Sequence, residues 1–210
     1  MTQQQRHFIQ CVAALTMLID HIGVVFFPDA IGLRAIGRLS FPLFAFGIAQ
    51  GVVFTHDFWR YFGRILLAAV ISQPIYWLTF RSAQANPLFM LAWGAAALHF
   101  WKNGRKEIAV PLLIGAIFCN MSYGWYGVWT IFLFGYYAAK ETLCFYGQLA
   151  LNALYGWRTG AWIQVLSLFS FAFLDGKWRI PALAKPLPRY FFYVFYPAHL
   201  LILCGLRAIL

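Results

Sequence analysis

FIQCVAALTMLIDHIGVVFF, residues 8–27, is a long apolar run that contains one acidic residue, Asp20, followed directly by His21. An apolar run of about 18 or more residues with few charges is long enough to cross a bilayer as a helix. Arg6 precedes the run as in a secretory signal peptide, but the run is too long for a signal sequence and similar runs follow. It therefore predicts a first transmembrane helix that is retained.

The composition of the whole chain agrees with that of a membrane protein. Of 210 residues, 62% are hydrophobic and 10% are charged, whereas soluble domains are about 25% charged. We predict one all-α domain, residues 1–210, folded as a polytopic membrane bundle of about nine spans, with eight or ten also compatible. The predicted segments are 8–27, 36–54, 61–80, 88–101, 108–120, 123–139, 142–155, 161–174 and 190–209. Four of these are short and also fit half-helices: 88–101, 108–120, 142–155 and 161–174.

The distribution of Lys and Arg predicts the orientation of the chain. With a cytoplasmic N-terminus, eleven of the 16 basic residues fall in inner loops and five in outer loops. This bias agrees with the positive-inside rule. We therefore predict a cytoplasmic N-terminus and place His21 in the outer half of the membrane.

Neither the net charge nor the cysteines indicate a further class of site. The formal net charge of +10 does not indicate a nucleic-acid partner, because the basic residues are scattered over short loops. The four cysteines lie in apolar runs without CxxC spacing. That pattern predicts small buried hydrophobes and no metal site.

Ionisable residues at membrane depth are functional candidates, since their desolvation must be offset. Asp20 is the only acidic residue inside a predicted span, and His199 lies midway along the last one. Adjacent helical residues point about 100° apart, so Asp20 and His21 are not expected to pair. We predict that Asp20 pairs with Arg38, at similar depth, and leaves His21 neutral and free to act. A purely structural ion pair, beside a histidine bonded to a carbonyl, is compatible with the same pattern.

Four motifs in sequence order carry a resemblance to a known family. They are MLIDHIG at 17–23, GRLSFPLFAF at 37–46 with FTH at 54–56, YGWYG at 123–127 and FYVFYPAHL at 192–200. Together they resemble the TraX family, named for an enzyme that acetylates the N-terminus of conjugative F-pilin. The resemblance covers nearly the whole chain.

The resemblance implies an acetyltransferase of the bacterial inner membrane. It would move an acetyl group from cytoplasmic acetyl-CoA to an acceptor amine, such as a pilin N-terminus, or to a hydroxyl of another peptide or small molecule. The catalytic residues that it implies are Asp20, His21, Arg38, Tyr123 and His199. His21 would act as general base or carry the acyl group briefly. Arg38 or Tyr123 would stabilise the developing oxyanion.

Coenzyme A carries a pyrophosphate and a ribose phosphate, so basic inner loops are candidates to bind it. These residues are Arg60, Arg64, Lys102, Arg105 and Lys106. The positive-inside rule explains the same charges equally well. Two other functions fit the sequence. A small proton-coupled transporter would use buried Asp and His residues, although the chain shows no related halves. A non-catalytic pilus-assembly protein would need no histidine at mid-membrane.

Overall fold

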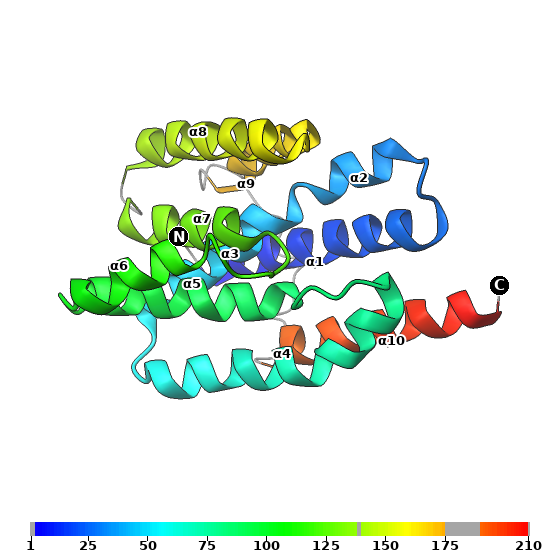
Figure 1. The fold of residues 1–210 in the computed structure, drawn as a ribbon, viewed down its shortest axis with the longest axis horizontal. Coiled ribbons are helices and arrows are strands. Elements are labelled where there is room, and N and C mark those ends of the chain that lie inside the picture. The colour runs from blue at the N-terminus through cyan, green and yellow to red at the C-terminus, as the bar shows by residue number, and fades with distance from the viewer. Residues whose placement is uncertain (1–2, 138–139, 175–189, 210) are drawn as a thin grey trace.

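The computed structural model describes residues 3–137, 140–174 and 190–209, and over these it is built from helices without a named strand (Figure 1). The predicted all-α class is confirmed for this part of the chain. Residues 138 and 139, at the end of the sixth predicted segment, lie outside the described residues. The helices are α1 Gln3–Phe26, α2 Ile31–Gly37, α3 Ser40–Phe54, α4 Phe58–Phe80, α5 Pro87–Lys102, α6 Lys106–Gly115, α7 Gly124–Tyr136, α8 Glu141–Thr159, the 3-10 helix η1 Trp162–Ser170, α9 Phe171–Leu174 and α10 Phe191–Ile209.

The prediction of about nine spans is not supported. Within the described residues, four stretches are long and apolar enough to cross a membrane: Gln4–Phe26, Ile31–Phe54, Phe58–Phe80 and Phe191–Ile209. The helices α6 and α7 have 10 and 13 residues. At ~1.5 Å per residue they fall well short of a hydrocarbon core of about 30 Å.

The second predicted segment, 36–54, covers α3 and only the last two residues of α2, and a break at Arg38 and Leu39 separates these helices. The backbone N–H of Arg38 bonds to the carbonyls of the preceding turn, and the Ser40 hydroxyl donates to the Gly37 carbonyl at 2.8 Å. Pro42 lies in the first turn of α3, where a missing backbone donor breaks no intrahelical bond. The break places Arg38 on the face of α2 that meets α1.

The helices pack around a core in which α3, α5 and α7 contact one another. Figure 1 shows α8 on one side of this core and α4 with α10 on the other. The contact between α4 and α10 includes a hydrogen bond of 2.8 Å from Arg207 Nη1 to the Thr79 carbonyl. The C-terminal helix α10 therefore packs beside α4, a helix that is more than 100 residues earlier in the sequence.

Aromatic contacts gather several helix ends at one end of the bundle. The Arg6 guanidinium lies 5.9 Å from the Phe54 ring centre, and the rings of Phe58 and His99 stack at 3.7 Å. The starts of α1 and α4 thus meet the ends of α3 and α5. We call this the basic end, because Arg6, Arg60, Arg64, Lys102, Arg105 and Lys106 lie on or beside these helix termini.

Gly94 tests the close approach of α5 to α7. A Cβ atom there would lie 2.6 Å from Ile131 Cδ1 and 3.2 Å from Ile131 Cβ, whereas nothing lies within 4 Å of one at Gly63. Gly94→Ala is expected to lower stability, since overpacking typically costs about 1–3 kcal/mol. Gly63→Ala should be neutral or stabilising by about 0.5–1 kcal/mol. Equal melting temperatures for the two variants in detergent would contradict this packing.

Candidate active site

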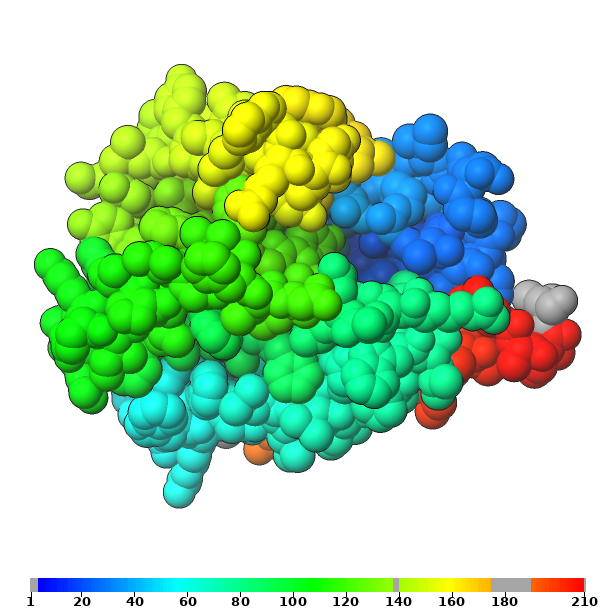
Figure 2. Space-filling view, viewed as in Figure 1, coloured from blue at the N-terminus to red at the C-terminus, as the bar shows by residue number. Residues whose placement is uncertain are grey.

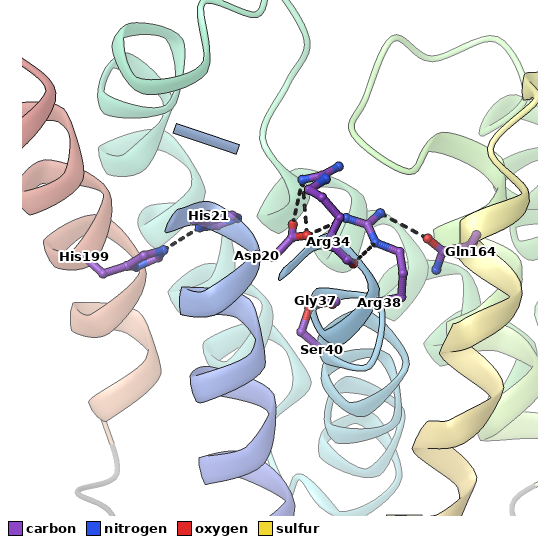
Figure 3. Close-up of polar contacts among 8 residues, drawn as sticks. All are labelled: Asp20, His21, Arg34, Gly37, Arg38, Ser40, Gln164 and His199. Atoms are coloured by element: carbon purple, nitrogen blue, oxygen red, sulfur yellow. Dashed lines mark hydrogen bonds and ion pairs between the residues drawn. The ribbon is translucent and has the colours of Figure 1, made fainter. Parts of the chain in front are cut away.

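A buried carboxylate held by two guanidinium groups forms the centre of the site. Asp20 is only 7% exposed, and its Oδ1 lies 2.7 Å from Arg38 Nη2. Arg34 Nη1 lies 3.2 Å from both carboxylate oxygens (Figure 3). The predicted Asp20–Arg38 contact is present, and Arg34 adds a second cation that the sequence interpretation did not include.

The remaining donors of Arg38 connect the ion pair to η1. Its Nε donates to the Arg34 carbonyl at 3.1 Å, and its Nη1 donates to Gln164 Oε1 at 3.3 Å. Gln164 in turn donates to the Tyr126 hydroxyl at 3.2 Å. Tyr126 donates to Asn152 on α8 at 3.0 Å. A buried network of this kind fixes its members more firmly than isolated pairs do.

The close contact between α1 and α2 requires a glycine at residue 37. A Cβ atom on Gly37 would overlap the side chain of Asp20, whereas one on Gly32, in the same helix, would meet open space. Only a residue without a side chain lets the Asp20 carboxylate lie against the backbone of α2.

His21 points away from Asp20, toward α10 (Figure 3). Its Nδ1 lies 2.8 Å from His199 Nε2, and His199 Nδ1 lies 2.8 Å from the Phe195 carbonyl oxygen. A carbonyl only accepts, so His199 Nδ1 carries a proton and its Nε2 accepts from His21 Nδ1–H when both rings are neutral. His21 Nε2 is then left with a free lone pair. His21 does not contact Asp20, as predicted, and His199 is a partner that the sequence did not indicate.

Aromatic packing fixes the rings of this histidine pair. The ring centres of His21 and His199 are 5.0 Å apart with nearly parallel planes, and His199 stacks on Phe195 at 4.9 Å. Phe80 meets His21 edge-on at 5.0 Å. His199 is 4% exposed, and its Nε2 contacts His21.

Tyr123 belongs to the same site, because it lines the same cavities as Asp20 and His21. It precedes α7 with a positive φ of 62°, a conformation that costs a non-glycine residue of order 1–3 kcal/mol. Hydrogen bonds between Ala85 and the 120–122 turn hold the loop, and the Tyr123 ring stacks on Phe41 at 4.2 Å. Its hydroxyl has no hydrogen-bond partner among the described residues.

Two cavities meet at these side chains. The first, of about 460 Å³, is mainly apolar and is lined from Arg6 and Thr55 at the basic end to His21; we call it the long cavity. The second, of about 390 Å³, includes Arg34, Arg38 and Ser122 in its lining; we call it the polar cavity. In Figure 2 the surface is hollowed between α2, the end of α8 and the loops after α4 and α6, with α1 at the floor. Both cavities are lined by Asp20, His21, Pro87 and Tyr123.

The five residues predicted to bind coenzyme A lie at the basic end but line neither cavity. Arg60 pairs with Asp57 at 3.1 Å, and Arg105 pairs with Glu107 at 3.4 Å. The basic residue in the lining of the long cavity is Arg6. That the five predicted residues bind coenzyme A stays a prediction.

Over residues 3–137, 140–174 and 190–209, no three His, Cys, Asp or Glu side chains lie close enough together to hold a metal ion.

Comparison with known proteins identifies the family. Residues 5–207 match the family model described as TraX protein. The chain belongs to the TraX family. It is 27% identical to the probable fimbrial assembly protein FimC, serogroup H1, of Dichelobacter nodosus, over 96% of this chain and 95% of that protein. It is 25% identical to the uncharacterized protein RP591 of Rickettsia prowazekii, over 60% of this chain and 49% of that protein. No solved structure gives a significant match.

Sequence reasoning missed two side chains of this TraX site. Arg34 precedes Arg38 by four residues, a spacing that places both on one helix face and could have been read as a pair. Gln164 is a polar residue within the apolar segment 161–174, which marks it as a candidate partner. The contact of His21 with His199 had no local signal, because it joins residues 178 positions apart.

Gly37→Ala tests the contact that positions Asp20. The added methyl group displaces the carboxylate from Arg38, so the melting temperature in detergent should fall by an amount that corresponds to about 1–3 kcal/mol. Gly32→Ala, on the same helix, is the matched control and should leave it unchanged or raised. Unaltered stability of Gly37→Ala would show that α1 and α2 do not pack as described.

Proposed function

We propose that this TraX-family protein is a membrane-embedded acetyltransferase that moves an acetyl group from acetyl-CoA to an amine or hydroxyl acceptor. The observation that supports it is the meeting of two cavities at His21, whose free Nε2 lone pair and neighbouring Tyr123 hydroxyl suit acyl transfer. The acetyl donor would enter through one cavity and the acceptor through the other, and the two would meet at His21.

The surface supports a location in the bilayer. In the described part of the chain, four stretches are apolar and long enough to span it. On α4 and α10, large apolar side chains are more than half exposed: Leu67, Leu78, Val194 and Ile202. Contiguous apolar surface of this kind is rare on soluble monomers, whereas lipid would cover it. The six Lys and Arg residues gathered at the basic end support a cytoplasmic location for that end, in the bacterial inner membrane.

The long cavity suits the donor. It follows α1 from Arg6 to His21, about 22 Å at ~1.5 Å per residue. A slender pantetheine arm could thread such a passage, while the phosphates of the nucleotide stay at the basic end. There Arg6 lines the cavity, and Arg60, Arg64, Lys102, Arg105 and Lys106 lie on or beside the helix termini of the same end.

The reaction then needs one base and one hydrogen-bond donor. An α-amine, with a pKa of about 7.7–8.0, attacks in its neutral form. Its nitrogen bonds to the thioester carbonyl carbon, His21 Nε2 takes the amine proton, and the Tyr123 hydroxyl donates to the oxyanion. The tetrahedral intermediate collapses as the C–S bond breaks. The sulfur leaves with the proton from His21, giving the amide and coenzyme A.

Tyr123 suits the oxyanion better than Arg38 does. All three guanidinium nitrogens of Arg38 are engaged, with Asp20, Gln164 and the Arg34 carbonyl. Arg38 and Asp20 therefore hold α1 in place, and His199 acts as a positioning residue that orients His21 and selects its tautomer.

The acceptor we favour is a pilin N-terminus or another membrane-associated peptide or small molecule. The support is the similarity to a relative named as a probable fimbrial assembly protein. A small proton-coupled transporter is the alternative, because a buried histidine pair between two cavities also suits proton transfer. A transporter, or a non-catalytic assembly protein, would neither hydrolyse nor transfer the acetyl group.

His21→Ala tests the base. Purified protein in detergent is given radiolabelled acetyl-CoA and a peptide amine, and transfer is measured together with coenzyme A binding. Transfer should fall about 10²–10⁴-fold with binding retained. His199→Leu should also slow transfer, whereas His199→Gln, which keeps an acceptor for His21 Nδ1–H, should recover part of the rate.

The exposed His56, which lines neither cavity, provides the matched control. His56→Ala should transfer at the wild-type rate. Wild-type turnover in folded His21→Ala would remove this histidine from the mechanism. Absence of transfer and of hydrolysis by the wild-type protein would favour the transporter.

A further inference from the structure

The polar cavity has more positive than negative charge. Its charged lining residues are Asp20, Arg34 and Arg38, one carboxylate against two guanidinium groups. Among the described residues, Asp20 is the only Asp or Glu that lines either cavity. The site therefore carries one positive charge in excess, because the two guanidinium groups share a single carboxylate.

Arg34 is the guanidinium group with hydrogen-bond donors left over. Arg38 is buried and its nitrogens are all engaged, whereas the Arg34 side chain is 33% exposed. Arg34 contacts Asp20 through Nη1, and its Nε and Nη2 have no partner within the described part of the chain. The edge formed by Nε and Nη2 is the planar fork that matches a carboxylate or a phosphate.

We propose that the acceptor carries an anionic group, a carboxylate or a phosphate, and that Arg34 binds this group in the polar cavity. The inference rests on the proposed acetyl transfer and narrows its substrate class. A cationic acceptor is disfavoured by the same surplus charge, because like charges in a partly buried site repel strongly. The acceptor amine must then reach His21 in its neutral form, as attack requires.

An anion at this place also assists the reaction. When His21 takes a proton, a third positive charge forms beside Arg34 and Arg38, which line the same cavity. A negative group on the acceptor offsets this charge at the moment it develops. The acceptor anion is therefore expected to raise kcat as well as to lower KM.

Matched peptide acceptors separate charge from shape. Ala-Asp-NH2 is compared with Ala-Asn-NH2, and Ala-phosphoserine-NH2 with Ala-Ser-NH2, in acetyl transfer by the detergent-purified protein. The wild type should favour the charged member by at least about tenfold in kcat/KM, which corresponds to ~1.4 kcal/mol. The pair with the larger ratio assigns the anion as carboxylate or phosphate.

Variants then assign the preference to one side chain. Arg34→Gln should reduce the ratio to about one, and Arg34→Lys, which keeps the charge but not the fork, should give an intermediate ratio. Arg158→Gln removes an exposed arginine from the last turn of α8 and should keep the wild-type ratio. Because the ratio is taken within each variant, a general loss of activity does not affect it.

Binding of the acetylated products gives a readout without turnover. Ac-Ala-Asp-NH2 should raise the melting temperature of the wild type more than Ac-Ala-Asn-NH2 does, and Arg34→Gln should abolish the difference. Equal kcat/KM for charged and neutral acceptors in the wild type would overturn this inference and leave acetyl transfer standing. Absence of any transfer would overturn the proposed function, and equal melting temperatures would then overturn the anion site too.

Discussion

The rest of the site depends on the ion pair between Asp20 and Arg38. A lone buried carboxylate would be costly, and removing one partner of such a pair costs roughly 3–5 kcal/mol. The structure offsets the charge with two guanidinium groups, of which Arg38 also bonds to Gln164. One interaction therefore fixes α1 against α2 and η1. Gly37 makes the contact possible by leaving room for the carboxylate.

The orientation of His21 follows from that constraint. Because Asp20 points to α2, its neighbour on the helix must point elsewhere, and it meets His199 on α10. The bond from His199 to the Phe195 carbonyl then determines which nitrogen of His21 is free. In the proposed reaction, a structural ion pair on one face of α1 thus prepares a base on the other.

Sequence alone predicted the helical class and the Asp20–Arg38 contact, because a single acidic residue at membrane depth has few possible partners. It did not predict the histidine pair, since nothing local indicates that α10 returns beside α1. It overestimated the number of membrane spans, because apolar composition does not distinguish a helix that crosses the bilayer from a short apolar helix such as α6, which has ten residues. It did not identify Arg34 as a site residue, because the second predicted segment begins at residue 36 and omits most of α2, which carries Arg34.

The most direct test is an experimental structure of the protein with coenzyme A bound. The proposed function predicts that the pantetheine arm occupies the long cavity, with the nucleotide near Arg6 and the sulfur beside Tyr123 and His21. A distance of about 3–4 Å from this sulfur to His21 Nε2 would allow His21 to protonate the departing thiolate. Coenzyme A bound in the polar cavity, or with its sulfur remote from His21, would contradict the proposal.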